Sequence, residues 1–285
     1  MNSTLPDTTR ISFLHLRVAS MEQVLPFYED ALGLQKVSEE TSTVGLSASQ
    51  SEKPFLYLSE DKTAKPAVRR APGLFHVAYL YQNRKELATA FKRLYEHQWP
   101  FQGFADHGVS EALYLADPEG NGIELYADRP RTTWRYRDGQ LQMTTDQLDV
   151  ENLLSEVSGD FGRGNGVHPQ TRIGHIHLQV SDLAKTEKFY HELTGFDVTQ
   201  RNYPGALFVS AGGYHHHLGF NTWNSRGTLR PAGSTTGILR YGVEVQNLQA
   251  LNDLKAKLRA FQRIEEKRDG TFIVQDQDGM EVEFS

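Results

Sequence analysis

Residues 189–196 read Phe-Tyr-His-Glu-Leu-Thr-Gly-Phe, and residues 27–34 read Phe-Tyr-Glu-Asp-Ala-Leu-Gly-Leu, at an offset of 189 − 27 = 162. In each copy a glycine stands where a helix is expected to stop. We therefore expect helices over residues 21–32 and 183–193, ended by Gly33 and Gly195. One helical element thus occurs twice in the chain.

Two further segments repeat in the same order and at nearly the same offset. Residues 73–83 match residues 237–247 at an offset of 164, and residues 117–125 match residues 276–284 at an offset of 159. Alternating apolar residues predict a strand before each helix and short strands after it. The predicted leading strands are 11–18, 73–81, 173–180 and 237–245. The sequence therefore predicts four βαβββ units, an α+β fold.

The composition limits the class of protein. The 285 residues suffice for two domains, and the formal net charge of −6 with a pI near 6.0 argues against a nucleic-acid binder. No apolar run reaches membrane-spanning length, and the start of the chain has no signal-peptide core, so we expect a cytoplasmic protein. Because the chain has no cysteine, its 11 histidines and its carboxylates are the available metal ligands.

Residues 129–170 interrupt the repeat. They are rich in Arg, Asp and Gly, contain one predicted helix at residues 146–157, and end in an irregular stretch at residues 161–170. We interpret them as a connector that packs across the first domain. The expected organisation is one domain over residues 1–128, this connector, and a second domain over residues 171–285.

A histidine-rich hairpin is predicted in the second half. Residues 207–223 read Leu-Phe-Val-Ser-Ala-Gly-Gly-Tyr-His-His-His-Leu-Gly-Phe-Asn-Thr-Trp, with the two glycines as the turn. Alternation along the second strand is expected to direct His216 to one face and His215 and His217 to the other. Taken alone, this stretch fits surface histidines at a hairpin tip as well as it fits a metal site.

A second histidine cluster and a carboxylate favour the metal site. His175 and His177 share one face of the strand predicted at residues 173–180, and Glu283 lies on the last predicted strand. Imidazole and carboxylate groups are typical ligands of divalent transition metals.

The repeated residues resemble the vicinal oxygen chelate superfamily, which is the glyoxalase, bleomycin-resistance and extradiol dioxygenase fold. The motifs that carry the resemblance are His175-x-x-Leu178-x-Val180-x-Asp182-Leu183, Phe189-Tyr190…Gly195-Phe196 and Asp117-Pro118-Glu119-Gly120-Asn121…Glu124. It covers nearly the whole chain apart from the connector. It implies that the four units pair into two domains, each an open, cup-like mixed sheet flanked by helices.

Within this superfamily the chain is most similar to two-domain, type I extradiol dioxygenases. Asp106-His107-Gly108-Val109-Ser110 and Asp128-Arg129-Pro130 look most like bacterial catechol 2,3-dioxygenase relatives. The resemblance implies His175, His216 and Glu283 as metal ligands in the second domain. Arg240 takes the fourth symmetric position, where glyoxalases of this fold usually have a ligand. Two histidines and one carboxylate suit Fe(II), with Mn(II) as the second choice.

The first domain is expected to hold no metal. The positions equivalent to His175 and His216 are Phe13 and Pro54, and Glu124 has only His76 beside it. We interpret Glu124 and His76 as a buried or half-buried polar pair, because one imidazole and one carboxylate rarely hold an ion.

Residues for proton transfer are harder to assign. Well-studied members of the family have a histidine before the second ligand, and they have a histidine and a tyrosine ahead of the final carboxylate. Residues 264–273, which precede Glu283, contain no histidine and no tyrosine. His177 is our first choice for an acid or base, with Tyr203 and Arg240 as substrate contacts. A hydrogen-bonded core position explains His177 equally well.

The resemblance implies an Fe(II)-dependent extradiol dioxygenase that cleaves catechol or a related diphenol with O2, and it is compatible with a homo-oligomer. Two alternatives stay open at this stage. One is a glyoxalase-type metal-dependent lyase or isomerase, and the other is a non-catalytic protein that binds a small aromatic compound or an antibiotic.

Overall fold

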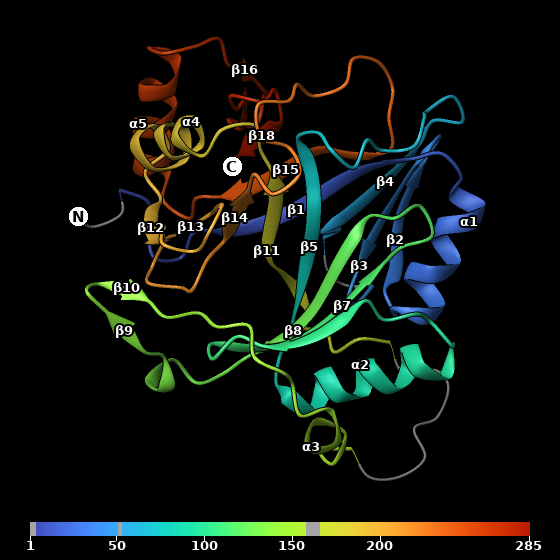
Figure 1. Ribbon diagram of the computed structural model, residues 1–285. Helices are drawn as coiled ribbons and strands as arrows, with labels where there is room; N and C mark the ends of the chain where they lie inside the picture. Colours follow the sequence, from blue (N-terminus) through green and yellow to red (C-terminus); the bar gives the residue numbers. More distant parts are fainter. Residues whose placement is uncertain (1–3, 51–52, 158–165) are drawn as a thin grey trace. The chain divides into compact units, whose positions relative to one another are not determined.

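The structure is a computed structural model that describes residues 4–50, 53–157 and 166–285 (Figure 1). The chain forms two compact units, and each is discontinuous in sequence. Unit 1 comprises residues 1–17, 65–75 and 174–285, and unit 2 comprises residues 18–64 and 76–173.

The strands form two eight-stranded sheets with parallel and antiparallel neighbours, which confirms the predicted α+β class with mixed sheets. Unit 1 contains the strand orders β12-β13-β14-β11 and β16-β17-β18-β15-β1. The pairs β11–β14 and β15–β18 are parallel, and β1–β15 is antiparallel. These strands are β1 (Arg10–Val18), β11 (Arg172–Gln179), β12 (Asp197–Gln200), β13 (Ala206–Ser210), β14 (Leu218–Asn221), β15 (Gly237–Glu244), β16 (Glu265–Glu266), β17 (Phe272–Gln275) and β18 (Glu281–Phe284).

Unit 2 contains the orders β5-β8-β7-β6 and β4-β3-β2. Here β5 and β8 are parallel, while β7 is antiparallel to both β6 and β8. The strands are β2 (Gln35–Glu40), β3 (Thr43–Ser47), β4 (Leu56–Glu60), β5 (Gly73–Tyr81), β6 (Gly103–Asp106), β7 (Ser110–Ala116) and β8 (Gly122–Asp128), with the short pair β9 (Tyr136–Arg137) and β10 (Gln140–Leu141).

The repeated Phe-Tyr motif forms a widened helical end in both copies. The α1 helix (Met21–Pro26) continues into a π-helical turn at Phe27–Ala31, and α4 (Leu183–Glu187) continues into another at Lys188–Leu193. Gly33 and Gly195 follow with φ of 86° and 90°, a conformation that favours glycine. The expected glycine stops are confirmed, but each predicted single helix is an α-helix followed by a π-helical turn.

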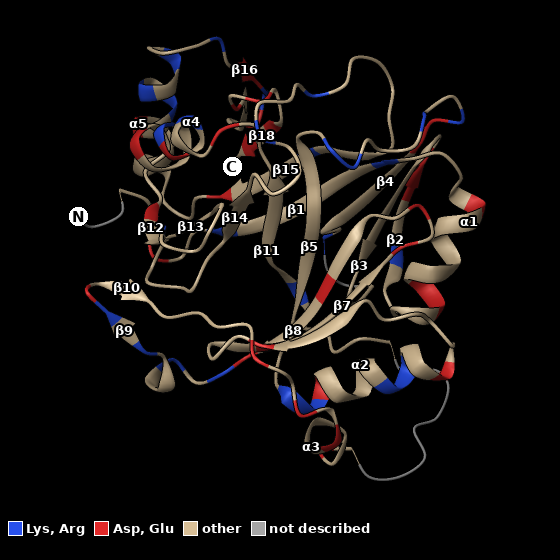
Figure 2. Cartoon of the chain, in the orientation of Figure 1, with Lys and Arg blue, Asp and Glu red and all other residues tan. Residues whose placement is uncertain are grey.

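All four repeats begin their helix in the same way. A polar side chain before the helix accepts a backbone N–H of the first turn, at Ser20, Asn83, Asp182 and Asn247. The longer helices, α2 (Arg84–Glu96) and α5 (Leu248–Arg259), bury leucines on one side and carry charges on the other (Figure 2). The remaining helical segments are α3 (Val150–Leu154) and a 3-10 turn at Arg131–Thr133.

The tyrosine of each motif anchors the turn before the last strand of its neighbouring repeat. The Tyr28 hydroxyl donates to Asp117 Oδ2, and the Tyr190 hydroxyl donates to Asp276 Oδ2, both at 2.9 Å. Asp276 Oδ1 also accepts the N–H of Met280 at 3.0 Å. Burial raises the pKa of Asp276 to about 6. The two units therefore use the same buried contact to fix equivalent turns.

The compact units differ from the expected division at residues 1–128 and 171–285. β1 pairs antiparallel with β15, so that the first seventeen residues belong to unit 1 with the C-terminal part of the chain. Apolar patterning finds a strand but not its partner, because strand pairing between distant segments is a tertiary property.

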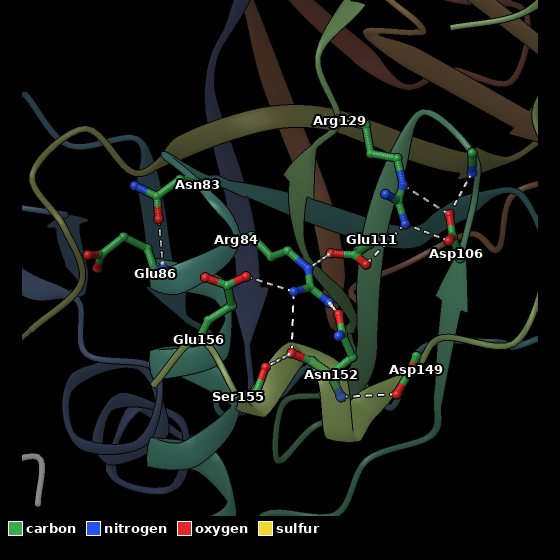
Figure 3. Close-up of polar contacts among 11 residues, drawn as sticks. Asn83, Arg84, Glu86, Asp106, Glu111, Arg129, Asp149, Asn152, Ser155 and Glu156 are labelled. Carbon is green, nitrogen blue, oxygen red and sulfur yellow. Dashed lines mark hydrogen bonds and ion pairs between the residues drawn. The ribbon is translucent and has the colours of Figure 1, made fainter. Parts of the chain in front are cut away.

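The connector packs on unit 2. Its helix is shorter than predicted, Val150–Leu154, and residues 158–165 of the expected irregular stretch lie outside the described residues. Arg84 at the start of α2 donates to Glu111 Oε2 at 2.6 Å, Asn152 Oδ1 at 2.7 Å and Glu156 Oε1 at 2.9 Å (Figure 3). Arg129 shares the same buried Glu111, at 3.1 Å. One guanidinium thus ties α3 to both α2 and β7.

Candidate metal centre

The caps give a common reference for comparing the four repeats. Counting seven residues back from each cap reaches one position on the leading strands (for example 83 − 76 = 7 and 182 − 175 = 7). These positions hold Phe13, His76, His175 and Arg240. Counting seven residues on from the anchored aspartates reaches the last strands, which hold Glu124 and Glu283. The internal repeat thus contains two imidazoles and two carboxylates at equivalent ligand positions.

In unit 2, one imidazole and one carboxylate face each other. His76 Nε2 lies 3.0 Å from Glu124 Oε2, and the two side chains are 8% and 3% exposed. This confirms the buried polar pair that the sequence predicts. Its donor atoms are of the types that bind Fe(II) or Mn(II).

A histidine and a tyrosine lie beside this pair, also in unit 2. The His107 Nδ1 is 2.6 Å from the Thr144 carbonyl, which can only accept, so the proton resides on Nδ1. The Nε2 atom is then an acceptor, and the Tyr114 hydroxyl donates to it at 2.7 Å. Tyr114 is the cross-strand partner of Glu124, and its ring lies 5.8 Å from that of His76. Side chains of directly paired residues share one face of a sheet.

Sequence reasoning missed His107 and Tyr114 as site residues, although the signal was present. The family pattern of a histidine and a tyrosine ahead of the final carboxylate is absent before Glu283. The same pattern occurs before Glu124, which is 124 − 107 = 17 and 124 − 114 = 10 residues further on. Applying the repeat to the first carboxylate would have found it.

In unit 1, three imidazoles cluster. The ligand nitrogens of His175, His215 and His216 all lie within 4.8 Å of one another, and all three side chains are buried. The Nδ1 atoms of His215 and His216 are 2.8 Å apart, so one donates its proton to the other. The structure therefore brings together two of the expected ligands, His175 and His216, and adds His215.

The predicted alternation of the histidine stretch is wrong. Gly212 and Gly213 both have positive φ, and β14 begins only at Leu218, so His215 to His217 lie in a turn and not on a strand. His215 is fully buried beside His216 and does not point away from it. His217 lies elsewhere in the turn, where its Nδ1 accepts the N–H of Ala211 at 3.3 Å.

The third expected ligand, Glu283, is engaged by cations. Its Oε2 lies 2.6 Å from Lys267 Nζ and 3.5 Å from Arg240 Nη1. Among the described residues, no group of three potential metal ligands includes Glu283. Arg240, expected as a substrate contact, forms an ion pair with this carboxylate, so an arginine replaces the histidine found at the equivalent positions 76 and 175.

His177 and Tyr203 belong to an aromatic cluster in unit 1. The ring of His177 lies 5.0 Å from Phe75 and 5.7 Å from both Phe208 and Trp223. Tyr203 packs near Phe208 and Trp223, at 6.2 Å and 6.3 Å. Trp223 is 44% exposed, so one wall of the cluster reaches solvent. Roles in proton transfer or substrate contact stay predictions for His177 and Tyr203.

The fold and these clusters define a class of protein. The model of the Glyoxalase/Bleomycin resistance protein/Dioxygenase superfamily matches residues 10–125 and 172–284. The chain belongs to this family, which confirms the resemblance inferred from the repeated motifs. Within the described residues, no helix is both long and apolar enough to span a membrane.

Two individual relatives within the superfamily are dioxygenases. The chain is 40% identical to a catechol-2,3-dioxygenase of Bacillus subtilis over 278 residues, 96% of each chain. It is 25% identical over 147 residues to biphenyl-2,3-diol 1,2-dioxygenase 3 of Rhodococcus globerulus, which covers 50% of this chain and 76% of that protein. The first match confirms the similarity to catechol 2,3-dioxygenases and the expectation of an enzyme of this type.

Solved structures agree on the fold. A provisionally assigned dioxygenase of Bacillus subtilis superposes with a TM-score of 0.67 at 12% identity, covering 100% of this chain and 86% of that one. Glyoxalase I from Zea mays superposes with a TM-score of 0.57 at 12% identity, covering 97% of this chain and 92% of that one. At such identities the likeness concerns the fold alone.

Proposed function

We propose that the protein is an Fe(II)-dependent extradiol dioxygenase that cleaves catechol or a related diphenol with O2. The observation that carries this proposal is the buried His76–Glu124 pair with the bonded His107 and Tyr114 beside it. The 40% identity to a catechol-2,3-dioxygenase over nearly the whole of both chains supports the same reaction class.

We assign His76 and Glu124, which face each other in unit 2, as metal ligands, in place of the set predicted from the sequence. His76 and His175 occupy the same position in two repeats, seven residues before a helix cap. Glu124 faces an imidazole, whereas Glu283 is neutralised by Lys267. Imidazole and carboxylate are the donor groups of non-haem Fe(II) oxygenases. In this assignment His216 is a neighbour of His175 and not a ligand.

The metal contributes one property that these side chains lack. When bound, Fe(II) supplies a redox-active cation that favours the anionic form of a bound phenol and couples the diphenol to O2. Side chains of the protein provide the groups for proton transfer. Tyr114 donates to His107 Nε2, and the Thr144 carbonyl fixes the proton on His107 Nδ1. A proton accepted at Tyr114 can therefore pass to His107 without a change in side-chain position.

A lyase of glyoxalase type is the second candidate, because the fold is shared with glyoxalase I from Zea mays. It differs from the dioxygenase in needing no O2. A non-catalytic binding protein is the third, and it is disfavoured because a buried carboxylate–imidazole pair costs desolvation energy that binding an aromatic compound does not require.

The test is turnover of catechol by Fe(II)-loaded protein with and without O2. We expect one O2 consumed per ring opened in air, and no product under anaerobic conditions. Equal turnover without O2 would establish the lyase. Tight catechol binding by metal-free protein, with no turnover in either condition, would establish the binding protein. The Tyr114→Phe variant is compared under the same conditions. It keeps the aromatic ring but removes the hydroxyl that donates to His107 Nε2, so its turnover reports the contribution of that hydrogen bond.

A further inference from the structure

Two polar atoms of unit 1 are buried without a hydrogen-bond partner among the described residues. They are Nε of Arg240 on β15 and Oγ of Ser12 on β1. The Arg240 guanidinium contacts Glu283 Oε2 through Nη1, at 3.5 Å, and this ion pair leaves the Nε–H group unused. A buried donor without an acceptor costs as much free energy as a lost hydrogen bond. Two such donors therefore point to a missing acceptor.

Both atoms lie on one face of β15. Positions 240 and 242 share a face, because side chains alternate along a strand. A Cβ atom at Gly242 would overlap Ser12 Oγ and the ring of Phe13, so both side chains lie over this glycine. The register of β1 shifts between Ile11 and Phe13, and this bulge explains how two successive side chains reach the same side. The hydroxyl and the guanidinium thus border one region of the sheet.

Positive charge prevails on this face. His15 is the cross-strand partner of Arg240, and its pKa is lowered to about 4, first by burial and then by the charges of Arg240 and Arg17. The imidazole is therefore neutral at pH 7. Lys267 Nζ lies 2.6 Å from the carboxylate of Glu283 and neutralises it. The remaining acid on this face is Glu281, which pairs with Arg240 across the strands.

The equivalent place in unit 2 has the opposite chemistry. His76 stands where unit 1 has Arg240, and its Nε2 lies 3.0 Å from Glu124. A neutral imidazole has a nitrogen that can bind a cation, whereas a guanidinium has five N–H donors and no acceptor. The histidine-to-arginine exchange between the repeats therefore changes a position suited to a metal ion into one suited to an anion.

We propose that Arg240 and Ser12 form a binding site for a small organic carboxylate, built entirely from residues of unit 1. The Nε–H edge of a guanidinium matches the two oxygens of a carboxylate, and the Ser12 hydroxyl donates a further hydrogen bond. A monoanion suits the site better than a dianion, because Glu283 lies beside it. The Phe13 ring next to Ser12 offers an apolar contact, which favours a carboxylate on an aromatic ring. The Arg240 side chain is 25% exposed, so a ligand can reach it from solvent.

The test is calorimetric titration of metal-free protein with benzoate, in a buffer that contains no other carboxylate and no phosphate. Metal-free protein is used so that benzoate cannot bind to iron. Benzamide has nearly the same shape without the charge, and inorganic phosphate supplies the dianion. We expect the wild-type protein to bind benzoate at least about tenfold more tightly than benzamide or phosphate.

Variants assign the binding to this site. Arg240→Gln and Arg240→Lys should each weaken benzoate binding at least about tenfold, because neither side chain offers a charged, forked pair of donors. Ser12→Ala should weaken it about threefold or more. Arg10→Gln is the matched control and should bind benzoate as wild type does. Arg10 lies on the same strand as Ser12, but its Nε already donates to Glu244 at 2.7 Å.

Folding is checked by circular dichroism and thermal unfolding without benzoate. The Tm of Ser12→Ala should lie within about 2 °C of wild type, because its hydroxyl has no partner among the described residues. Absence of benzoate binding by the wild-type protein would overturn the proposal, and so would equal affinity of wild type and a folded Arg240→Gln. Tighter binding of phosphate or benzamide than of benzoate would overturn the assignment of a carboxylate. None of these results bears on the proposed function, which depends on residues of unit 2 and is tested by oxygen-dependent turnover.

Discussion

Asp276→Asn should change how the stability of the protein depends on pH. Burial raises the pKa of Asp276 from 3.8 to about 6. Because the folded-state pKa is above the unfolded-state value, the contribution of this group to stability is complete below about pH 4 and is lost as the pH rises through 6. The shift corresponds to about 3 kcal/mol, at about 1.4 kcal/mol for each pKa unit.

An amide at position 276 removes the titration with little loss of bonding. Its oxygen can still accept the N–H groups of Asp278 and Met280, and its nitrogen can donate to the Tyr190 oxygen, whose own proton can go to Tyr241 at 2.7 Å. We therefore expect the free energy of unfolding of the variant, relative to wild type, to rise by about 3 kcal/mol between pH 4 and pH 7.

The comparison between variant and wild type matters because a second group acts in the opposite direction. Burial, followed by the charges of Arg240 and Arg17, lowers the pKa of His15 from 6.5 to about 4. Since the folded-state pKa is depressed, His15 costs stability as the pH falls from about 6.5 toward 4. The two groups offset each other near pH 5 in the wild-type protein.

Urea unfolding of metal-free protein, followed by circular dichroism at half-unit steps from pH 4 to pH 7, measures the effect. The exposed Asp269, whose pKa is lowered by its hydrogen bonds to Thr271, gives the matched control. Asp269→Asn should show no rise relative to wild type. Parallel pH profiles for Asp276→Asn and wild type would refute this explanation.

Three further outcomes are expected. Tyr114→Phe should lower the rate of O2 uptake by about 10²-fold or more while iron content stays at the wild-type level, and an unchanged rate would exclude Tyr114 from proton transfer. Gly242→Ala should cost about 1–3 kcal/mol in urea unfolding, since its Cβ would meet the ring of Phe13, whereas Gly103→Ala, which meets nothing, should stay within about 0.5 kcal/mol. Arg84→Ala should lower the free energy of unfolding by about 1–3 kcal/mol and speed proteolysis at α3, because its charged hydrogen bonds to Asn152 and Glu156 are lost. Equal proteolysis of variant and wild type would show that other contacts hold α3.

Local features of the fold were predictable from the sequence. Repeated letters identified four βαβββ units, and the glycines at 33 and 195 stop their helices as expected. Capping and left-handed glycines depend on a few neighbouring residues, so pattern reasoning captures them. The π-helical turns were not expected from the sequence; each contains the tyrosine, Tyr28 or Tyr190, whose hydroxyl donates to a buried aspartate far along the chain.

The ligand set was harder to predict for a tertiary reason. Glu124 and Glu283 stand at equivalent places in their repeats, and the histidines at 175 and 216 made the sequence favour Glu283. Their surroundings differ: Glu124 faces His76, and Glu283 faces Lys267 and Arg240. Lys267 lies 283 − 267 = 16 residues before its partner, so no short motif announces the ion pair.

The most direct test of the account is the iron content of two variants that differ only in which carboxylate is removed. Glu124→Gln and Glu283→Gln, each loaded with Fe(II) without oxygen and freed of excess metal, are compared with wild type by elemental analysis. We predict that Glu124→Gln loses most of its iron and that Glu283→Gln keeps the wild-type amount, because only Glu124 faces a histidine ligand. Full iron in Glu124→Gln and an empty Glu283→Gln would contradict the account and restore Glu283 as the ligand.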